Sequence, residues 1–356
     1  MTRSYPKRKP VLKSALLAST LTSGADVNGD TNKSGSKTPA SNSELLKTLS
    51  ELEPQRVKVR EFTLYGILGI SPFVAAIFIN DMVEGFVPLT YLLVLLIPFL
   101  GGMVCAGIAY TKYQAYKKDY KHGIVAEIFA SIAPELSYKA EEHISPGVYM
   151  ASKLFRRSYD RYNGDDFLFG KMGQTDVMFS EIHSEYYTKG KNNSKNWHTI
   201  FKGFFFTADF HKEISGETYV LPDIAEKRLG FVGKMLQKKN PFKHAGELVK
   251  LENKAFEKEF VVYSSDQIEA RYCLTPSMME SLVKLQKQFK SKVYISFIHS
   301  NVNIAISSRK NNFEPRIFKS GVDPALITEM RELFTLLTSI VEELNLNTRI
   351  WGKKAA

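Results

Sequence analysis

Cysteine is nearly absent from this sequence of 356 residues: Cys105 lies inside a long apolar run, and Cys273 lies far away in a polar part of the chain. We do not expect these two residues to pair. The sequence therefore gives no sign of a disulfide-stabilised fold or of an oxidising compartment.

Recognisable catalytic motifs are also lacking. The seven histidines are scattered and form neither an HExxH motif nor a Cys/His cluster with zinc spacing, and no GxSxG or phosphate loop is present. Two sets of acidic residues and histidine alternate, so that each would share one strand face: Asp209, His211 and Glu213, and Glu181, His183 and Glu185. Either set could bind a metal, but we favour the interpretation of both as polar strand faces. We expect no catalytic residue, metal or cofactor, and enzymatic activity is disfavoured.

Charge is absent from two long apolar runs, residues 62–80 and 86–110. At about 1.5 Å of rise per residue, each run is long enough to cross a hydrocarbon core of about 30 Å as a helix. A short connector joins them, so they predict a transmembrane helical hairpin. The alternative, a buried hairpin of a soluble protein, is disfavoured because core helices of this length usually keep a polar face. With no charged residue in either span, a channel or transporter is also disfavoured.

The charges that flank these runs predict the orientation of the hairpin. Basic residues lie next to both outer ends, whereas the connector is acidic, which places both termini in the cytoplasm. The membrane-orienting residues are Arg56, Lys58, Arg60, Lys112, Lys117, Lys118 and Lys121 at the basic ends and Asp81 and Glu84 in the connector.

The net charge of +11 indicates an anionic partner. Much of the basic excess lies in the N-terminal tail and beside the membrane runs, so we expect contact with anionic lipid, and nucleic acid is disfavoured. Residues 1–42 predict a disordered basic tail, with a signal peptide as the less favoured alternative. The remaining divisions are a juxtamembrane helix (43–61), the hairpin (62–110), a helical region (111–160) and a cytoplasmic domain (161–351).

The cytoplasmic domain has the pattern of an α+β fold with a mostly antiparallel sheet and packed amphipathic helices. The sequence Asn163-Gly164-Asp165-Asp166 predicts a turn. Helices are expected over residues 146–160 and 224–237, after Thr275-Pro276 and after Asp323-Pro324. Strands are expected at 167–171, 175–187, 199–210, 218–221, 256–263, 268–274, 293–298 and 302–307.

The helix predicted over residues 224–237 carries a basic side. Its candidate lipid-surface residues are Lys227, Arg228, Lys234, Lys238 and Lys239. Such a helix can lie on anionic lipid. The alternative, a core-packed helix with a solvated charged face, is favoured.

Three blocks of sequence resemble a known family. These blocks are similar to the bacterial domain-of-unknown-function 3137 family. They are LVKLENKAFEKEFVVYSSDQIEARYCLTPSMMESL at 248–282, FKGFFFTADFHKEISGETYVLPD at 201–223 and NGDDFLFGKMGQTDVMFSEIHSEY at 163–186. The family-like motif in the first block consists of Glu269, Ala270, Arg271, Tyr272, Leu274, Thr275 and Pro276. The resemblance covers residues 43–351 and implies a bacterial membrane protein, but it carries over no activity and no catalytic residue.

Together these observations predict an integral protein of the bacterial inner membrane. Its cytoplasmic α+β domain would act as a binding or scaffold module for lipid and an unidentified protein partner. The alternative is a membrane-tethered enzyme, hydrolytic or lipid-directed, whose site is assembled from residues distant in sequence.

Overall fold

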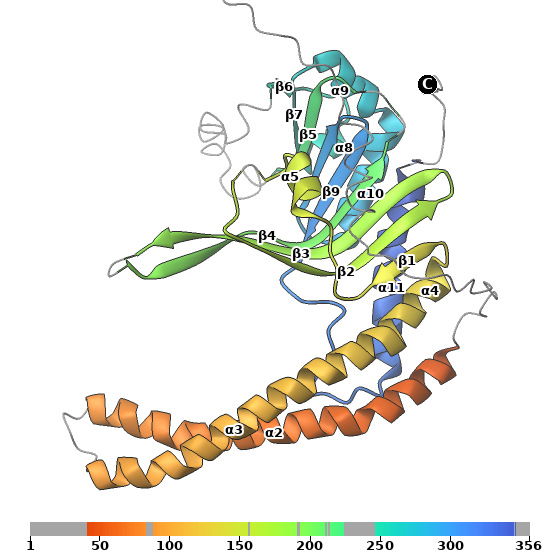
Figure 1. Cartoon of the computed structure of the whole chain (residues 1–356). Helices are drawn as coiled ribbons and strands as arrows, with labels where there is room; N and C mark the ends of the chain where they lie inside the picture. Colours follow the sequence, from red (N-terminus) through yellow and green to blue (C-terminus); the bar gives the residue numbers. More distant parts are fainter. Residues whose placement is uncertain are drawn as a thin grey trace, which may run out of the picture.

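The computed structural model describes residues 41–82, 88–155, 157–190, 193–210, 212, 214–223, 246–344 and 346. Within these residues the chain forms two long apolar helices followed by an antiparallel nine-stranded sheet with packed helices (Figure 1). The predicted α+β fold is therefore confirmed. The connector residue Glu84 and the whole predicted basic helix, including Lys227, Arg228, Lys234, Lys238 and Lys239, lie outside the described residues.

The first long helix, α2 (Asn42–Met82), continues through the predicted juxtamembrane helix and the first apolar run with Pro54 and Pro72 inside it. The juxtamembrane helix expected over 43–61 is thus part of a longer one. On the return, α3 (Leu89–Tyr120) is followed without a break by a π-helical turn, η1 (Lys121–Val125), and by α4 (Ala126–Ile132). The helix ends before Pro134, as expected from a residue that cannot donate a backbone hydrogen bond.

Glycine residues allow α2 and α3 to cross closely. A Cβ atom on Gly69 would lie 2.5 Å from the carbonyl oxygen of Pro98, and one on Gly102 would lie 2.9 Å from the backbone nitrogen of Ile70. Gly66 faces Ala106 in the same contact. Small residues thus let two helices of the same chain approach closely.

The sheet has the order β1-β2-β3-β4-β9-β8-β5-β7-β6. The strands are β1 (Leu136–Lys139), β2 (Arg161–Met172), β3 (Thr175–Lys189), β4 (Lys195–Asp209), β5 (Glu217–Pro222), β6 (Glu247–Val249), β7 (Phe260–Ser264), β8 (Val293–Ile298) and β9 (Asn301–Ser307). Every described neighbouring pair is antiparallel. β4 lies between β3 and β9, with Phe204 and Phe206 in one core and Phe201 and Phe205 in the other. Apolar side chains on both of its faces suit a strand that is covered on both sides.

One core joins the long helices to the sheet. Leu49 of α2 and Tyr120 of α3 are buried in the same cluster as Phe204 of β4 and Phe334 of α11 (Pro324–Glu343). A smaller core on the other sheet face lies under α5 (Pro146–Ala151), where Tyr149 packs between Phe155 and Phe205. The segments predicted as 43–61 and 111–160 therefore help to build the core of the α+β domain.

Four local predictions were wrong in whole or in part. The helix expected over 146–160 is only the short α5, and the turn expected at 163–166 lies inside β2. The strand expected over 256–263 is a short helix, α8 (Lys254–Glu257), followed by β7. The strand expected over 268–274 is a helix, α9 (Gln267–Cys273).

The error at α9 has a clear physical cause. Apolar residues alternate from Ile268 to Leu274, but Ile268 is 80% exposed, and the buried positions are Ala270, Cys273 and Leu274, which have helical spacing. The carboxylate of Asp266 accepts hydrogen bonds from the backbone N–H groups of Ile268 (2.7 Å) and Glu269 (3.0 Å). This N-cap starts a helix that the strand-like pattern concealed.

The other cap signals predicted their helices correctly. Thr275 accepts a hydrogen bond from the N–H of Met278 and begins α10 (Pro276–Phe289). Asp323 accepts one from the N–H of Ala325, at 2.9 Å, and begins α11. In both helices proline occupies the first turn, where its missing N–H costs nothing.

Beyond the partner strand β2, strands β3 and β4 continue alone as a two-stranded arm, defined here as residues 186–190 and 193–198. Figure 1 shows that this arm extends from the sheet on the same side as the apolar end of the hairpin. Cations lie over its aromatic rings: Arg157 over Tyr186, Arg161 over Trp197 and Lys195 over Tyr187. Such contacts stiffen a ribbon that has few other neighbours.

Candidate functional site at the junction of hairpin and sheet

The residues predicted to orient the hairpin fall into two groups in the structure. Lys58 and Lys118 are exposed, Arg60 is half-buried, and the ammonium of Lys112 lies 5.7 Å from the centre of the Phe62 ring. Asp81 is exposed at the distal end of α2. The second group, Arg56, Lys117 and Lys121, is bound to acidic or carbonyl partners of the chain itself.

Arg56 ties α2 to the segment that connects β9 to α11, residues 308–323. Its guanidinium donates to the carboxylate of Glu53 and to the backbone carbonyl of Ile317. Glu53 also accepts a hydrogen bond from the N–H of Gly321 at 3.2 Å. Because Arg56 is buried, this charge fixes the hairpin to the domain in addition to any effect on orientation.

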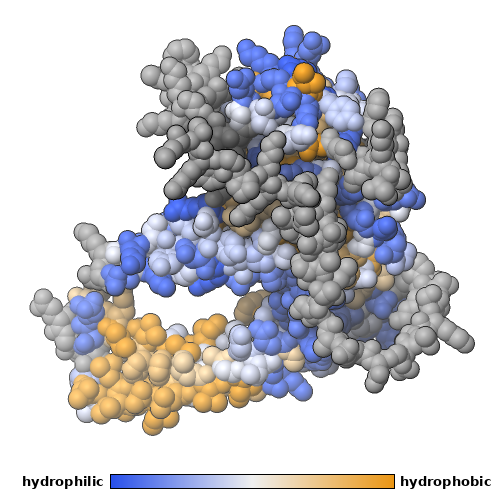
Figure 2. All heavy atoms as spheres, turned by 45° about the horizontal axis from the view of Figure 1, so that its top comes forward, coloured by the Kyte–Doolittle hydropathy of each residue, from blue (hydrophilic) through white to orange (hydrophobic). Residues whose placement is uncertain are grey.

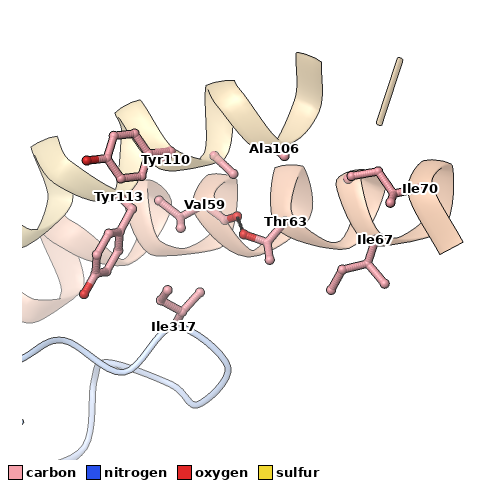
Figure 3. Close-up of a pocket in the computed structure, with 10 residues that line it drawn as sticks. Val59, Thr63, Ile67, Ile70, Ala106, Tyr110, Tyr113 and Ile317 are labelled. Carbon is pink, nitrogen blue, oxygen red and sulfur yellow. Dashed lines mark hydrogen bonds between the residues drawn. The ribbon is translucent and has the colours of Figure 1, made fainter. Parts of the chain in front are cut away.

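An apolar pocket of about 290 Å³ lies beside this contact. Figure 3 shows Val59 and Thr63 from α2, Tyr110 from α3 and Ile317 from the 308–323 segment around it. The Thr63 hydroxyl donates to the carbonyl of Val59, so it presents little free polarity to the pocket. The lining suits an alkyl chain or another apolar group and offers no set of converging acids or bases.

A buried charge cluster lies next to the pocket, and we define it as Lys117, Lys121, Asp165, Asp166, Glu181 and Glu314. Tyr113 lines the pocket and donates its hydroxyl to Glu314 at 3.2 Å, which links the two features. Glu314 bonds Lys117 at 2.6 Å and Lys121 at 3.3 Å. Elements distant in sequence, α3, η1, β2, β3 and the 308–323 segment, thus meet at one point.

Lys121 is the centre of this charge cluster. Its side chain is 1% exposed, and its ammonium lies 2.7 Å from Asp165 and 2.9 Å from Asp166. Burial alone would lower the pKa of Lys121, but the charges of Asp166, Asp165 and Glu314 outweigh it and raise this pKa. The lysine is therefore charged and cannot leave without exposing unpaired carboxylates.

The two aspartates differ in their environment. Tyr138 donates its hydroxyl to Asp166 at 2.5 Å. Burial and the neighbouring charge of Asp165 nevertheless raise the pKa of Asp166 to about 7. For Asp165 burial acts in the same direction, but the charge of Lys121 outweighs it and lowers the pKa. Burial, with the charges of Asp166 and Asp165, raises the pKa of Glu181 to about 8.

Sequence reasoning missed this cluster. It placed Asp165 and Asp166 in a turn and grouped Glu181 with His183 and Glu185, whereas β2 pairs Asp165 directly with Glu181. His183 lies near Glu185, with 3.5 Å between Nε2 and Oε1. Asp209 belongs to β4, while His211 and Glu213 lie outside the described residues. The available signal was two consecutive aspartates within an otherwise aromatic strand.

The family-like motif lies elsewhere, at the junction of α9 and α10. Glu269 and Arg271 bond different partners: Glu269 accepts hydrogen bonds from the N–H groups of Ser215 (3.0 Å) and Gly216 (2.6 Å), and Arg271 donates to the carbonyl of Gln267. Ala270 and Leu274 are buried, Tyr272 is partly exposed, and Thr275 and Pro276 start α10. The motif thus shapes and caps two helices.

Comparison with known proteins gives one match. A comparison with curated proteins and one with solved structures each found no match. The model of a family described as "Protein of unknown function (DUF3137)" matches residues 199–346. This range runs from β4 to the end of α11 and contains Glu314, but not the hairpin or the other members of the charge cluster. The predicted resemblance to the DUF3137 family is therefore confirmed for residues 199–346.

Proposed function

We propose that this chain is an integral protein of the bacterial inner membrane whose α+β domain is a binding module held at the cytoplasmic face. One observation carries the proposal: the hairpin is apolar and exposed at one end and built into the domain core at the other. In each long helix only 11% of the most apolar stretch is buried. In a core helix of a soluble protein, most of the apolar stretch would be buried.

The exposed apolar surface of the hairpin is large. Leu68 and Ile97 are 71% and 76% exposed, and Figure 2 shows the apolar side chains gathered over the distal part of the two helices. A patch of this kind in water promotes association, whereas in a bilayer it meets a matching solvent. Both segments are α-helices, the structure that satisfies most backbone polar groups internally, as hydrocarbon requires.

The binding role rests on the surfaces that the domain offers near the membrane. The pocket at Ile317 is apolar, and the arm carries the exposed Lys189 and Lys195 beside Tyr187 and Trp197. Aromatic rings and lysines together are typical of the headgroup layer. We propose that the arm rests on anionic headgroups and that other exposed parts of the domain bind a protein partner.

The arm also limits how the hairpin sits in the bilayer. It extends on the same side as the apolar helices (Figure 1), yet its exposed lysines cannot enter hydrocarbon at low cost. We therefore propose that the spans tilt away from the arm. The arm then stays in the headgroup layer while α2 and α3 cross the hydrocarbon.

The enzyme alternative needs a site open to substrate. The carboxylates that converge are Asp165, Asp166 and Glu181, and they lie against Lys121 and Tyr138. The apolar pocket beside them supplies no acid or base to an incoming bond. These contacts favour the binding module, and we do not propose a reaction.

Alkaline carbonate extraction tests membrane integration of the full chain. We expect the protein to stay in the membrane pellet and to be released only by detergent, because the two spans hold it in hydrocarbon. Release by carbonate alone would show peripheral attachment and refute the proposal. A known peripheral protein and a known integral protein of the same membranes serve as controls.

The arm can be tested through the fluorescence of Trp197. The sequence contains two tryptophans, so replacing Trp351 with phenylalanine leaves Trp197 as the single reporter. The protein is placed in nanodiscs that contain anionic lipid and headgroup-attached quenchers, and we expect strong quenching of the Trp197 fluorescence. The quenching should be weaker in Lys189→Glu/Lys195→Glu, since each lysine near an anionic surface contributes about 1 kcal/mol of attraction.

The matched control is Lys254→Glu/Lys258→Glu, which reverses two exposed lysines at α8. We expect the Trp197 fluorescence of this variant to be quenched as strongly as that of the parent. Equal quenching in the arm variant, or no quenching in any variant, would rule out the proposed contact between the arm and lipid.

A further inference from the structure

The three acidic side chains of the charge cluster converge in an unusual way. Oxygen atoms of Asp165, Asp166 and Glu181 all lie within 4.8 Å of one another. In a regular strand, Asp165 and Asp166 would point to opposite faces of the sheet. Both nevertheless bond Lys121, because the register of β2 shifts between Asp165 and Leu168 and Asp166 has a φ of 57°.

A second backbone irregularity meets the first. Lys121 opens the π-helical turn η1, which interrupts the regular α-helical path between α3 and α4. π-helical turns and β-bulges re-aim side chains and are frequent next to functional sites. Here both bring charged groups to the same buried point.

The cluster contains more acidic than basic side chains. Four carboxylates (Asp165, Asp166, Glu181 and Glu314) face two ammonium groups (Lys117 and Lys121). Buried charge without compensation is expensive. When all four acids are ionised, the cluster needs two further positive charges.

Glu181 has an unpaired oxygen that could bind an added positive charge. Its side chain is only 6% exposed, its Oε1 is buried without a hydrogen-bond partner, and its Oε2 accepts only a long bond of 3.4 Å from the N–H of Asn312. Buried polar atoms are nearly always satisfied, so an orphaned carboxylate oxygen beside two other acids points to a missing cation.

We propose that Asp165, Asp166 and Glu181 bind a divalent cation of the hard, oxygen-preferring class, such as Mg²⁺, Ca²⁺ or Mn²⁺. Two ligands of one ion at about 2.4 Å can be at most about 4.8 Å apart, and these three oxygens all lie within that distance of one another. Carboxylate ligands without histidine or cysteine favour this class over zinc or copper.

The cation would also have a structural consequence. It would link β2 and β3 to each other, and through Lys121 and Glu314 to the helix that leaves the membrane and to the 308–323 segment. The site is built from residues of this chain alone and does not depend on the proposed membrane topology.

The test is Mn²⁺ binding to the full chain in a non-ionic detergent after treatment with EDTA, followed by electron paramagnetic resonance of free Mn²⁺. We expect one saturable site and a higher melting temperature with Mn²⁺, and competition should show whether Mg²⁺ or Ca²⁺ binds there too. Glu181→Gln should weaken binding about tenfold or more, since even outer-shell changes at metal sites cost 10- to 100-fold.

The matched control is Glu142→Gln, which alters an exposed carboxylate paired with Lys139 and should bind Mn²⁺ like the parent. If Glu181→Gln does not fold, Asp165→Asn, at a more exposed position, serves in its place. Absence of saturable binding to the parent would overturn the proposal, and so would binding that neither variant weakens. If the parent binds no metal and Glu181→Gln is more stable than the parent, the acids of the cluster are neutralised by protons alone.

Discussion

Replacing Lys121 with methionine is expected to lower the free energy of unfolding by about 3–5 kcal/mol. The substitution keeps much of the apolar stem of the side chain but removes the ammonium that bonds Asp165, Asp166 and Glu314. Lys117 alone would then face the acids. Urea unfolding in detergent with EDTA present, followed by circular dichroism, measures the change without any contribution from bound metal.

Lys118→Met is the matched control, because Lys118 is exposed one turn away and its loss should change stability by no more than about 0.5 kcal/mol. A double variant, Lys121→Met/Asp166→Asn, should recover part of the loss, since it also removes a carboxylate that would remain unpaired. Equal stability of the parent and Lys121→Met would show that the charge cluster does not hold the junction together.

Replacing Phe129 with alanine is expected to have a comparable effect, about 3–5 kcal/mol. The ring is buried where α4 meets the domain, with centroid distances of 4.1 Å to Phe334 of α11, 4.7 Å to Tyr138 of β1 and 5.1 Å to Phe313 of the 308–323 segment. Its loss opens a cavity between α4, the sheet and α11. The same unfolding experiment measures it.

Phe318→Ala is the control for this experiment. Phe318 belongs to the same 308–323 segment but is largely exposed, so its truncation should cost little. If Phe129→Ala and Phe318→Ala lowered the free energy of unfolding by the same small amount, the hairpin and the sheet would not share a core that is important for stability.

The sequence predicts the hairpin and the sheet because each depends on local patterns. An uncharged run of sufficient length suggests a span by itself, and the apolar faces of β4, β8 and β9 are visible in their own residues. Thr275-Pro276 and Asp323-Pro324 likewise start helices through contacts within a few residues. These features need no knowledge of distant parts of the chain.

The charge cluster is different because its members come together only in the folded chain. Lys121 meets Asp165 across 44 positions, and Tyr113 meets Glu314 across 201. A turn signature at Asn163–Asp166 concealed a β-bulge, since both patterns favour the same residue types. The alternation from Ile268 to Leu274 was misleading in a similar way, because the cap at Asp266 decides for a helix.

The proposed position of the hairpin in a membrane can be tested directly with single cysteines. In a chain whose Cys105 and Cys273 are replaced, Asp81→Cys reports on the distal end of α2 and Glu142→Cys on the exposed surface of the domain. Both variants are treated in spheroplasts with a membrane-impermeant maleimide. We predict labelling of Asp81→Cys in sealed spheroplasts and of Glu142→Cys only after permeabilisation. Labelling of Glu142→Cys from outside, or protection of both positions followed by carbonate release of the protein, would contradict a domain anchored at the cytoplasmic face.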